Sequence, residues 1–262
     1  MYRRGPGLTR KDAPMRHHDP HRHAQPILMV FILLAIWGLA SGQRTGQVAS
    51  AVELVEQFKT SRIFWQQFEV AVKLVKLHDT SVLEQLQPYV RDQDRHVRGN
   101  AAYIFAELGD DRGFEVIKAI LTDRSERPEG QGFPGGNWTL GVQISADRYY
   151  AVHLFGDLKD VRAVAILVPL LDDSEVNYIV PWALGEIGEK AAVPPLMQIL
   201  IDKNPDMRVL AIDALETLRA KEALPQLHLL IHDDERIHFD GLGTVGEAAR
   251  GAIAKLEGEP AK

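Results

Sequence analysis

The chain has 262 residues, of which 45% are hydrophobic and 25% are charged, so a sizeable core is possible. Its formal net charge of −6 argues against nucleic-acid binding, because that binding needs basic stripes that displace counterions. It contains no cysteine, which excludes disulfides, thiolate metal sites and a catalytic thiol.

Residues 1–26 form a basic, histidine-rich leader, in which six Lys and Arg residues outnumber Asp12 and Asp19. We expect this polar stretch to be disordered. Clustered histidines can bind nickel or zinc. The four histidines of the leader are His17, His18, His21 and His23. A polar, disordered leader accounts for them more simply, so we predict no metal site.

A hydrophobic segment follows at residues 27–42, and Ile27–Ala40 reads ILMVFILLAIWGLA without a charge. Fourteen helical residues span roughly 21 Å, short of the roughly 30 Å hydrocarbon core of a bilayer. The length favours a cleaved secretory signal, with an uncleaved membrane anchor as the alternative. Because the positive residues precede the run, we expect the remainder to be exported, either periplasmic or membrane-anchored outside the cytoplasm. The start is Met1 or Met15.

The strongest signal in the rest of the chain is internal repetition, with a unit near 30 residues. Six segments align, and their equivalent alanine-type residues lie 31, 50, 29, 31 and 38 residues apart. These residues are Val70, Ala101, Ala151, Val180, Ala211 and Ala249. A second apolar stretch follows each of the first five segments. In both stretches apolar residues recur every three or four positions, which is the helical period.

Each unit is therefore predicted to be a helical hairpin, and about five to six of them should stack into an all-α solenoid over residues 48–258. One hairpin cannot cover its apolar faces alone, so neighbours must share a core. A capping helix is expected at Val48–Lys59. Pro194 and Pro225 fall near the starts of second helices, where proline is tolerated. Pro181 lies deeper in its expected helix and should bend it.

Three segments carry a resemblance to a known family: VRGNAAYIFAELGD (97–110), EKAAVPPLMQIL (189–200) and MRVLAIDALETLRA (207–220). They resemble HEAT repeats of the phycobilisome-lyase-like type. The resemblance covers roughly residues 66–257 and implies fold rather than function. It also implies that Arg98, Arg148 and Arg208 join aspartates in a structural ladder. Asn177 and Gly246 stand where the ladder would need arginine, so it should be broken there.

Two families of HEAT-type enzymes supply the enzymatic alternatives. Deoxyhypusine hydroxylase needs His-Glu pairs for two irons, and no His-Glu dipeptide occurs in this chain. Phycobilin lyase subunits resemble the repeat more closely but act inside the cell, whereas the leader points outwards. No nucleophile elbow or phosphate-binding loop is present. We therefore predict a protein that is not an enzyme, with no catalytic residue, no cofactor and no metal.

Some polar residues of the first helices invite a catalytic interpretation. Glu107, Asp157, Glu186 and Glu216 recur near the ends of successive first helices. Recurrence across repeats is typical of architecture, since a catalytic pair would break the repeat. We interpret His153 in the same way, as a histidine at the surface or at the edge of the core.

Two interruptions of the repeat are candidate binding sites, because long loops inside compact domains are often functional. The first, at residues 122–145, is rich in Gly and Pro and carries Phe133 and Trp138. The second, at residues 232–244, carries His238 and Phe239. Both join a second helix to the next first helix. The two loops should therefore project from one edge and flank a partner.

The outward positions of the second helices should line the concave face of the solenoid. They include Lys118, Pro169, Met197, Gln198, His228 and Leu229. Several of these residues are apolar or uncharged, which suits contact with a partner's helix or strand. We predict an exported or membrane-tethered scaffold that binds another protein through this face and the 122–145 loop. The alternatives are a phycobilin-lyase-like enzyme or chromophore chaperone, and a self-associating structural module.

Overall fold

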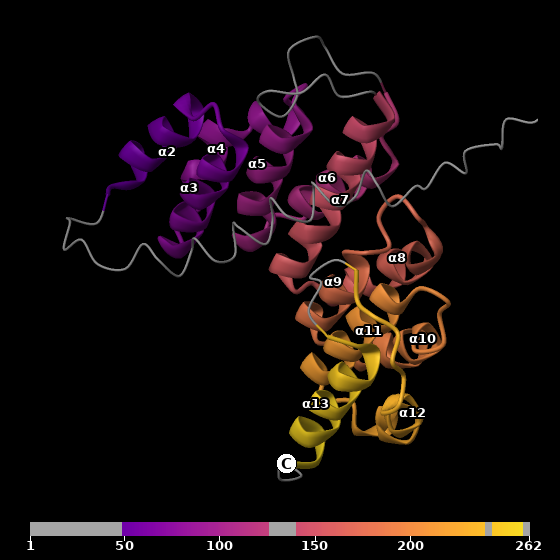
Figure 1. Ribbon diagram of the computed structural model, residues 1–262. Coiled ribbons are helices and arrows are strands. Elements are labelled where there is room, and N and C mark those ends of the chain that lie inside the picture. The colour runs from indigo at the N-terminus through magenta and orange to yellow at the C-terminus, as the bar shows by residue number, and fades with distance from the viewer. Residues whose placement is uncertain (1–48, 126–139, 239–242, 259–262) are drawn as a thin grey trace, which may run out of the picture. The chain divides into compact units, whose positions relative to one another are not determined.

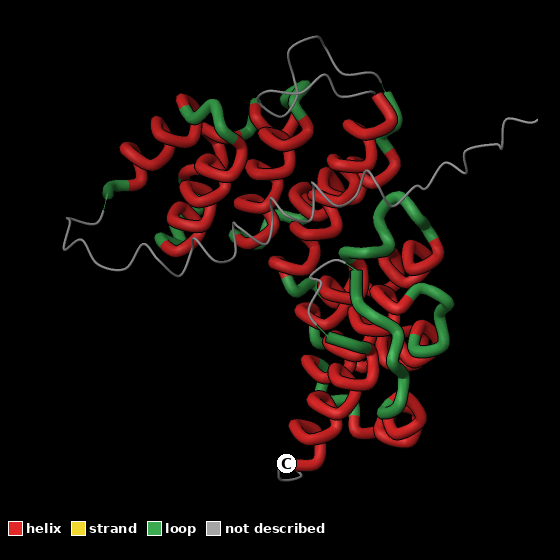
Figure 2. Tube along the Cα trace, viewed as in Figure 1, coloured by secondary structure: helices red, strands yellow, loops and turns green. Residues whose placement is uncertain are grey.

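A computed structural model describes residues 49–125, 140–238 and 243–258. The predicted leader and hydrophobic segment lie outside these ranges, so the division of the chain into those parts stays a prediction. Within the described ranges the regular elements are all helices, with no named strand and one isolated antiparallel bridge between Arg236 and Thr244 (Figure 2). None of the described helices is long and apolar enough to cross a membrane.

The helices alternate between two series along the chain. The first helices are α3 (Phe64–Lys76), α5 (Arg95–Glu107), α7 (Leu140–Leu158), α9 (Val180–Ile187), α11 (Pro205–Thr217) and α13 (Val245–Gly258). The second helices are α4 (Val82–Leu86), α6 (Arg112–Thr122), α8 (Val164–Leu167), α10 (Val193–Ile199) and α12 (Leu224–Leu230). Short 3-10 turns extend several second helices: η2 (Tyr89–Arg91), η3 (Val161–Ala163), η4 (Val168–Asp172), η5 (Lys190–Ala192) and η6 (Lys221–Ala223). The helix α2 (Ala51–Thr60) precedes the first hairpin, capped by Ser50.

Packing between the hairpins follows the order of the chain (Figure 1). Helix α3 packs on α5, α5 on α7, α7 on α9, α9 on α11, and α11 on α13. Fully buried Ala101, Ala151, Ala211 and Ala249 lie on these helices, and their small size permits close approach. The described residues thus form an all-α solenoid of stacked helical hairpins.

The turn after each of five first helices uses the left-handed backbone region. Gly109 and Gly188 adopt φ of 84° and 78° there, where glycine has no steric penalty. The equivalent turns hold His78, Lys159 and Arg219, with φ of 52° to 53°. A residue with a Cβ costs roughly 1–2 kcal/mol in this conformation. Three of the turns therefore hold a basic residue in a backbone conformation that glycine would adopt at a lower free-energy cost.

The predicted arginine ladder is present at the three positions that hold arginine. Arg98 Nη2 lies 2.9 Å from Asp123 Oδ2, and Arg208 Nη2 lies 2.9 Å from Asp233 Oδ2. Arg148 pairs in the same way with Asp173. Each guanidinium reaches an aspartate 25 residues further along the chain, which lies just after the second helix of the same hairpin. Positions 177 and 246 carry no guanidinium and add no rung.

Two local expectations are corrected by the helix bounds. Pro181 lies in the first turn of α9, which begins at Val180, so it does not bend a helix interior. Its missing N–H and fixed φ suit a helix start, and turns fill residues 174–179 instead. Helix α7 begins at Leu140. Residues 140–145, which were expected to belong to the 122–145 loop, therefore form the start of this helix.

Gly113 permits a backbone contact between α5 and α6. A Cβ at this position would lie 2.2 Å from the Ala102 carbonyl oxygen and 2.4 Å from the Ala106 nitrogen. Gly113→Ala should therefore lower the free energy of unfolding, measured in urea, by about 1–3 kcal/mol. Gly251 in α13 has nothing within 4 Å of such a Cβ, so Gly251→Ala should raise it by about 0.5–1 kcal/mol. Equal effects of the two substitutions would refute this account of the contact.

Candidate functional site

The predicted concave-face residues all lie on second helices or their 3-10 extensions. Lys118, Pro169, Gln198, His228 and Leu229 are exposed, and Met197 is half-buried. Leu229 is 81% exposed, which is unusual for a large apolar side chain. These residues therefore face solvent, while their role in binding stays a prediction.

One of these residues, Pro169, lines a shallow hollow of about 540 Å³ between the second helices of neighbouring units. Its lining is mostly apolar and consists of Val161, Val164, Ala165, Val168, Pro169, Glu189 and Ala191. The volume falls within the range of small-ligand pockets, but such pockets are normally enclosed and carry several converging polar groups. Glu189 is the charged residue in this lining, so the hollow offers contact area and little chemistry.

The two predicted loops are described only at their edges. Phe133, Trp138 and Phe239 lie outside the described residues. His238 is described, and its side chain is 67% exposed. Its backbone N–H donates to Asp206 Oδ1 at 2.6 Å, and its Nδ1 lies 3.5 Å from Asp206 Oδ2. The structure therefore ties His238 to the start of α11, and the role of the loop residues in binding stays a prediction.

A different set of side chains meets on the first helices. We define the His153 cluster as Tyr103 and Glu107 of α5, His153 and Asp157 of α7, and Trp182 of α9. His153 Nδ1 lies 3.0 Å from Asp157 Oδ2, one helical turn along α7. The imidazole also stacks on the Trp182 indole, with ring centroids 4.5 Å apart and planes tilted by 34°. Both members of the His–Asp pair are about one quarter exposed, so solvent or a ligand can reach them.

The position of Trp182 depends on a glycine in the facing helix. A Cβ at Gly156 would lie 2.6 Å from Trp182 Cζ3 and 3.1 Å from the Ala183 Cα. The absence of a side chain at this point of α7 therefore lets the indole lie across the helix. From there its ring reaches His153, three residues earlier on α7.

The electrostatics of the His153 cluster are acidic. Burial raises the pKa of the Tyr103 phenol, and the carboxylates of Glu107 and Asp157 raise it further. Burial likewise raises the pKa of the Glu107 carboxyl, and the charge of Asp157 adds to that shift, against a hydrogen bond from Tyr103. Glu107 therefore keeps its proton to a higher pH than an ordinary glutamate. Two carboxyl groups, an imidazole and the Trp182 indole therefore meet at one place, and such groups can take part in proton transfer.

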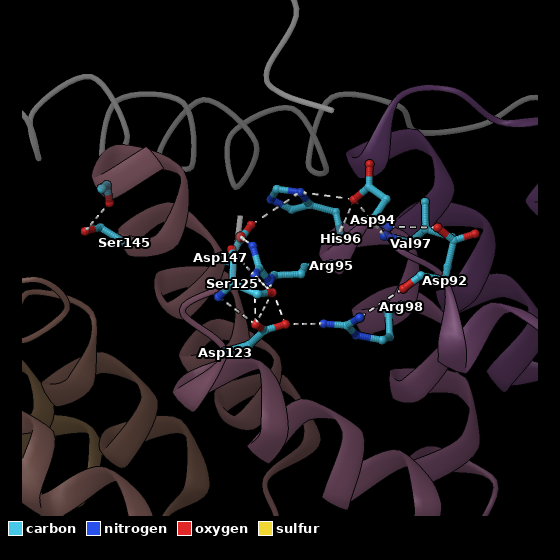
Figure 3. A network of polar contacts seen from close by, with 11 residues as sticks. Asp92, Asp94, Arg95, His96, Val97, Arg98, Asp123, Ser125, Ser145 and Asp147 are labelled. Atoms are coloured by element: carbon cyan, nitrogen blue, oxygen red, sulfur yellow. Dashed lines mark hydrogen bonds and ion pairs between the residues drawn. The ribbon is translucent and has the colours of Figure 1, made fainter. Parts of the chain in front are cut away.

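A second polar group is centred on the buried Arg95 of α5 (Figure 3). The Arg95 guanidinium, 3% exposed, donates from Nε to Asp123 Oδ2 at 2.9 Å and from Nη1 to Asp147 Oδ2 at 3.0 Å. Its Nη2 donates to the Ser125 carbonyl at 2.7 Å. Hydrogen bonds from Arg95 hold the pKa of Asp123 far below its usual range. Because the buried Arg95 guanidinium is paired with two carboxylates, we assign this group a structural role.

His96 completes this buried group. Its Nδ1 lies 3.6 Å from Asp94 Oδ1 and 3.9 Å from Asp147 Oδ1. Its ring packs against Phe64 and against Tyr150, with centroid distances of 4.5 Å and 5.1 Å. With 5% of its surface exposed, His96 is less accessible to a ligand than His153.

The His153 cluster escaped the sequence interpretation for a physical reason. Its residues come from three units, and only the packing of α5, α7 and α9 brings them together. The available signal was the four-residue spacing of His153 and Asp157, which places both on one helix face. Trp182 had no such signal, because its contact depends on the gap at Gly156.

Comparisons with known proteins point to a biochemical class. A family model described as HEAT repeats matches residues 145–215, which include His153, Asp157 and Trp182. Bilin biosynthesis protein PecE of Mastigocladus laminosus is 30% identical over 149 residues, 55% of this chain and 51% of the relative. PecE of Nostoc sp. is 30% identical over 149 residues, 55% of this chain and 54% of the relative. Phycocyanobilin lyase subunit alpha of Picosynechococcus sp. is 31% identical over 155 residues, 46% of this chain and 57% of the relative. The chain spans about half the length of the curated relatives it matches.

These relatives confirm one prediction and overturn two. The resemblance to HEAT repeats of the phycobilisome-lyase-like type is confirmed. The prediction of a non-enzymatic scaffold is wrong, because the relatives are named for bilin biosynthesis and as a lyase subunit. That prediction rested on the absence of catalytic motifs contiguous in the chain and on the direction of the leader.

The prediction of an exported, periplasmic or membrane-anchored protein is also wrong. It depended on residues 1–42 alone, which lie outside the described residues. It was also the argument used to set the phycobilin lyases aside, and the similarity to bilin proteins removes that argument.

Proposed function

We propose that the chain binds a bilin and serves as a phycobilin-lyase-like subunit, which presents the chromophore for attachment to an acceptor protein. The observation that carries the proposal is the His153 cluster, which combines an acid–base pair with an aromatic face inside the matched HEAT repeats. A chromophore chaperone that binds the bilin without accelerating its attachment would use the same site. The two roles differ only in the chemical step.

The chemistry of a bilin matches the groups present. A bilin is an open chain of four conjugated pyrrole-type rings, so it offers flat apolar faces and ring N–H donors. The Trp182 indole provides a stacking surface for such a ring. Asp157 and Glu107 of the same cluster provide acceptors for the N–H groups.

Attachment to a cysteine needs a proton carrier. The sulfur forms a bond to an exocyclic carbon of the bilin, one carbon–carbon π bond breaks, and the thiol proton ends on the neighbouring carbon. His153 can carry that proton, and Asp157, whose Oδ2 lies 3.0 Å from His153 Nδ1, orients the imidazole ring. Because this chain contains no cysteine, the thiol belongs to another protein, which makes a protein partner part of the proposal.

Bilin binding is tested by titrating the purified protein with phycocyanobilin and following the absorbance. We expect the visible band to shift and sharpen as the ligand is held extended. Trp182→Ala should weaken binding by roughly tenfold or more, since a stacking contact contributes about 0.5–1.5 kcal/mol beyond its buried area. Trp65→Ala is the matched control, because Trp65 lies on α3, meets Phe64 edge to face and is outside the His153 cluster. The absence of any spectral change with the wild-type protein would end the proposal.

A further inference from the structure

Lys159 stands where the fold does not require a side chain. It follows α7 at a left-handed φ of 53°, and the equivalent turns after α5 and α9 hold Gly109 and Gly188. A positive charge at a helix C-terminus interacts favourably with the helix dipole, which accounts for a basic residue but not for where its side chain reaches. The turn itself would close more easily with glycine.

The side chain of Lys159 reaches across to the next first helix. Its Nζ lies 3.0 Å from Glu186 Oε2 of α9, and 60% of the lysine side chain remains exposed. Lys159 follows Asp157 by two residues, and Glu186 follows Trp182 by four. The Lys159–Glu186 contact therefore crosses from α7 to α9 about one helical turn (~5.4 Å) beyond the contact of His153 with Trp182.

The surroundings of Lys159 are acidic. Glu107 and Asp157 belong to the His153 cluster, and Glu186 is the lysine's own partner. A ligand that lies on Trp182 and carries a carboxylate would be repelled by these groups unless a cation met it. Lys159 is a cation at the edge of the cluster, and its ammonium has three donors, of which Glu186 occupies one.

We propose that Lys159 binds a carboxylate of the ligand held by the His153 cluster, and that it selects the free acid over neutral forms. The inference rests on the proposed function, in which that carboxylate is a propionate of the bilin. A propionate extends two methylenes beyond its ring, so a ring stacked on Trp182 places its carboxylate near the lysine. An exposed ion pair such as Lys159–Glu186 is weak, which allows the ligand to share or take the ammonium.

The test compares phycocyanobilin with its dimethyl ester, in which both propionates are neutral. The wild-type protein should bind the free acid at least fivefold more tightly than the ester. Lys159→Gly and Lys159→Gln should bind both forms equally, and Lys159→Arg should restore the preference. Lys159→Gly should melt no lower than the wild type because it relieves the left-handed strain, so lost preference does not reflect unfolding.

Arg219 supplies the matched control. It has the same left-handed φ of 53° at the end of α11, away from the His153 cluster. Arg219→Gly should keep the wild-type preference. A preference retained by Lys159→Gly or Lys159→Gln would overturn the role of Lys159 and leave bilin binding intact. If Arg219→Gly also loses the preference for the free acid, that preference comes from the overall positive charge of these turns and not from Lys159, and the inference is overturned. A wild-type protein that binds neither form refutes the proposed function itself.

Discussion

Replacing Arg95 with alanine should lower the free energy of unfolding by about 3–5 kcal/mol, because it leaves a buried charge without its pair. Asp147 has no exposed side-chain surface, and Arg95 Nη1 lies 3.0 Å from its carboxylate. The same guanidinium holds Asp123 and Ser125. The substitution therefore removes the arginine from Asp147 and removes one of the two arginines of Asp123, which keeps its contact with Arg98. It also removes the hydrogen bond to Ser125 after α6. Urea unfolding followed by circular dichroism measures the effect.

Arg124 provides the control for this prediction. It lies in the same segment and pairs with Glu175 at 2.8 Å, but 52% of its side chain is exposed. Arg124→Ala should therefore change stability by less than about 1 kcal/mol. A similar loss of stability in the Arg95→Ala and Arg124→Ala variants would show that the buried pair with Asp147 contributes no more stability than an exposed ion pair. Replacing Arg95 and Asp147 together by apolar residues should recover much of the loss, since no unpaired charge remains.

The Arg95 contacts also predict a dependence on pH. Because they lower the pKa of Asp123 in the folded protein, the stability that this carboxylate contributes is fully present above its unfolded pKa of about 3.9. That contribution is lost as the pH falls toward the lower folded value. Arg95→Ala should therefore lose less stability on acidification below about pH 4 than the wild type does.

Replacing His153 with glutamine should slow thiol addition to bound bilin by about 100-fold or more, the usual range for a lost proton carrier. Binding should change by only a few-fold, because the stacking surface of Trp182 remains. The reaction can be followed with phycocyanobilin and N-acetylcysteine as the thiol. Each addition removes one double bond from conjugation, so the visible band moves to shorter wavelength.

His228→Gln is the matched control for this reaction. His228 is an exposed histidine of α12 beside Glu257, with 3.4 Å between Nε2 and Oε1, and it lies outside the His153 cluster. It should leave the rate unchanged. An unaltered rate in His153→Gln, with bilin still bound, would favour a chromophore chaperone over a lyase-like subunit. Equal losses of binding and rate would assign His153 to the binding surface alone.

The repeated part of the fold was predictable because it is encoded within each unit. Apolar residues at helical spacing gave the two series of helices, and the arginine at one position gave the ladder through Arg98, Arg148 and Arg208. Pro194 and Pro225 lie in the first turns of α10 and α12, as expected. These features depend on neighbours close in sequence or on contacts that every unit repeats.

Other features depend on contacts that no single unit contains. The four-residue spacing of His153 and Asp157 was visible, but their contact with Trp182 requires α7 and α9 to approach at Gly156. The acids at the ends of first helices were interpreted as architecture because they recur. Recurrence cannot distinguish Glu186, which pairs with Lys159, from Glu107, whose pKa is raised beside Tyr103. The function was misjudged for the same reason.

The Arg95 contacts have a consequence for how the chain tolerates change between α6 and α7. Asp123 and Ser125 lie before residues 126–139, and Asp147 lies after them. The Arg95 guanidinium donates hydrogen bonds to all three residues. Because Arg95 holds the two ends of this stretch together, each doubling of its length should raise the entropic cost of closing the loop by only about 0.6 kcal/mol. Changes in the length or sequence of residues 126–139 should therefore cost little stability, so we expect related proteins to differ in this stretch.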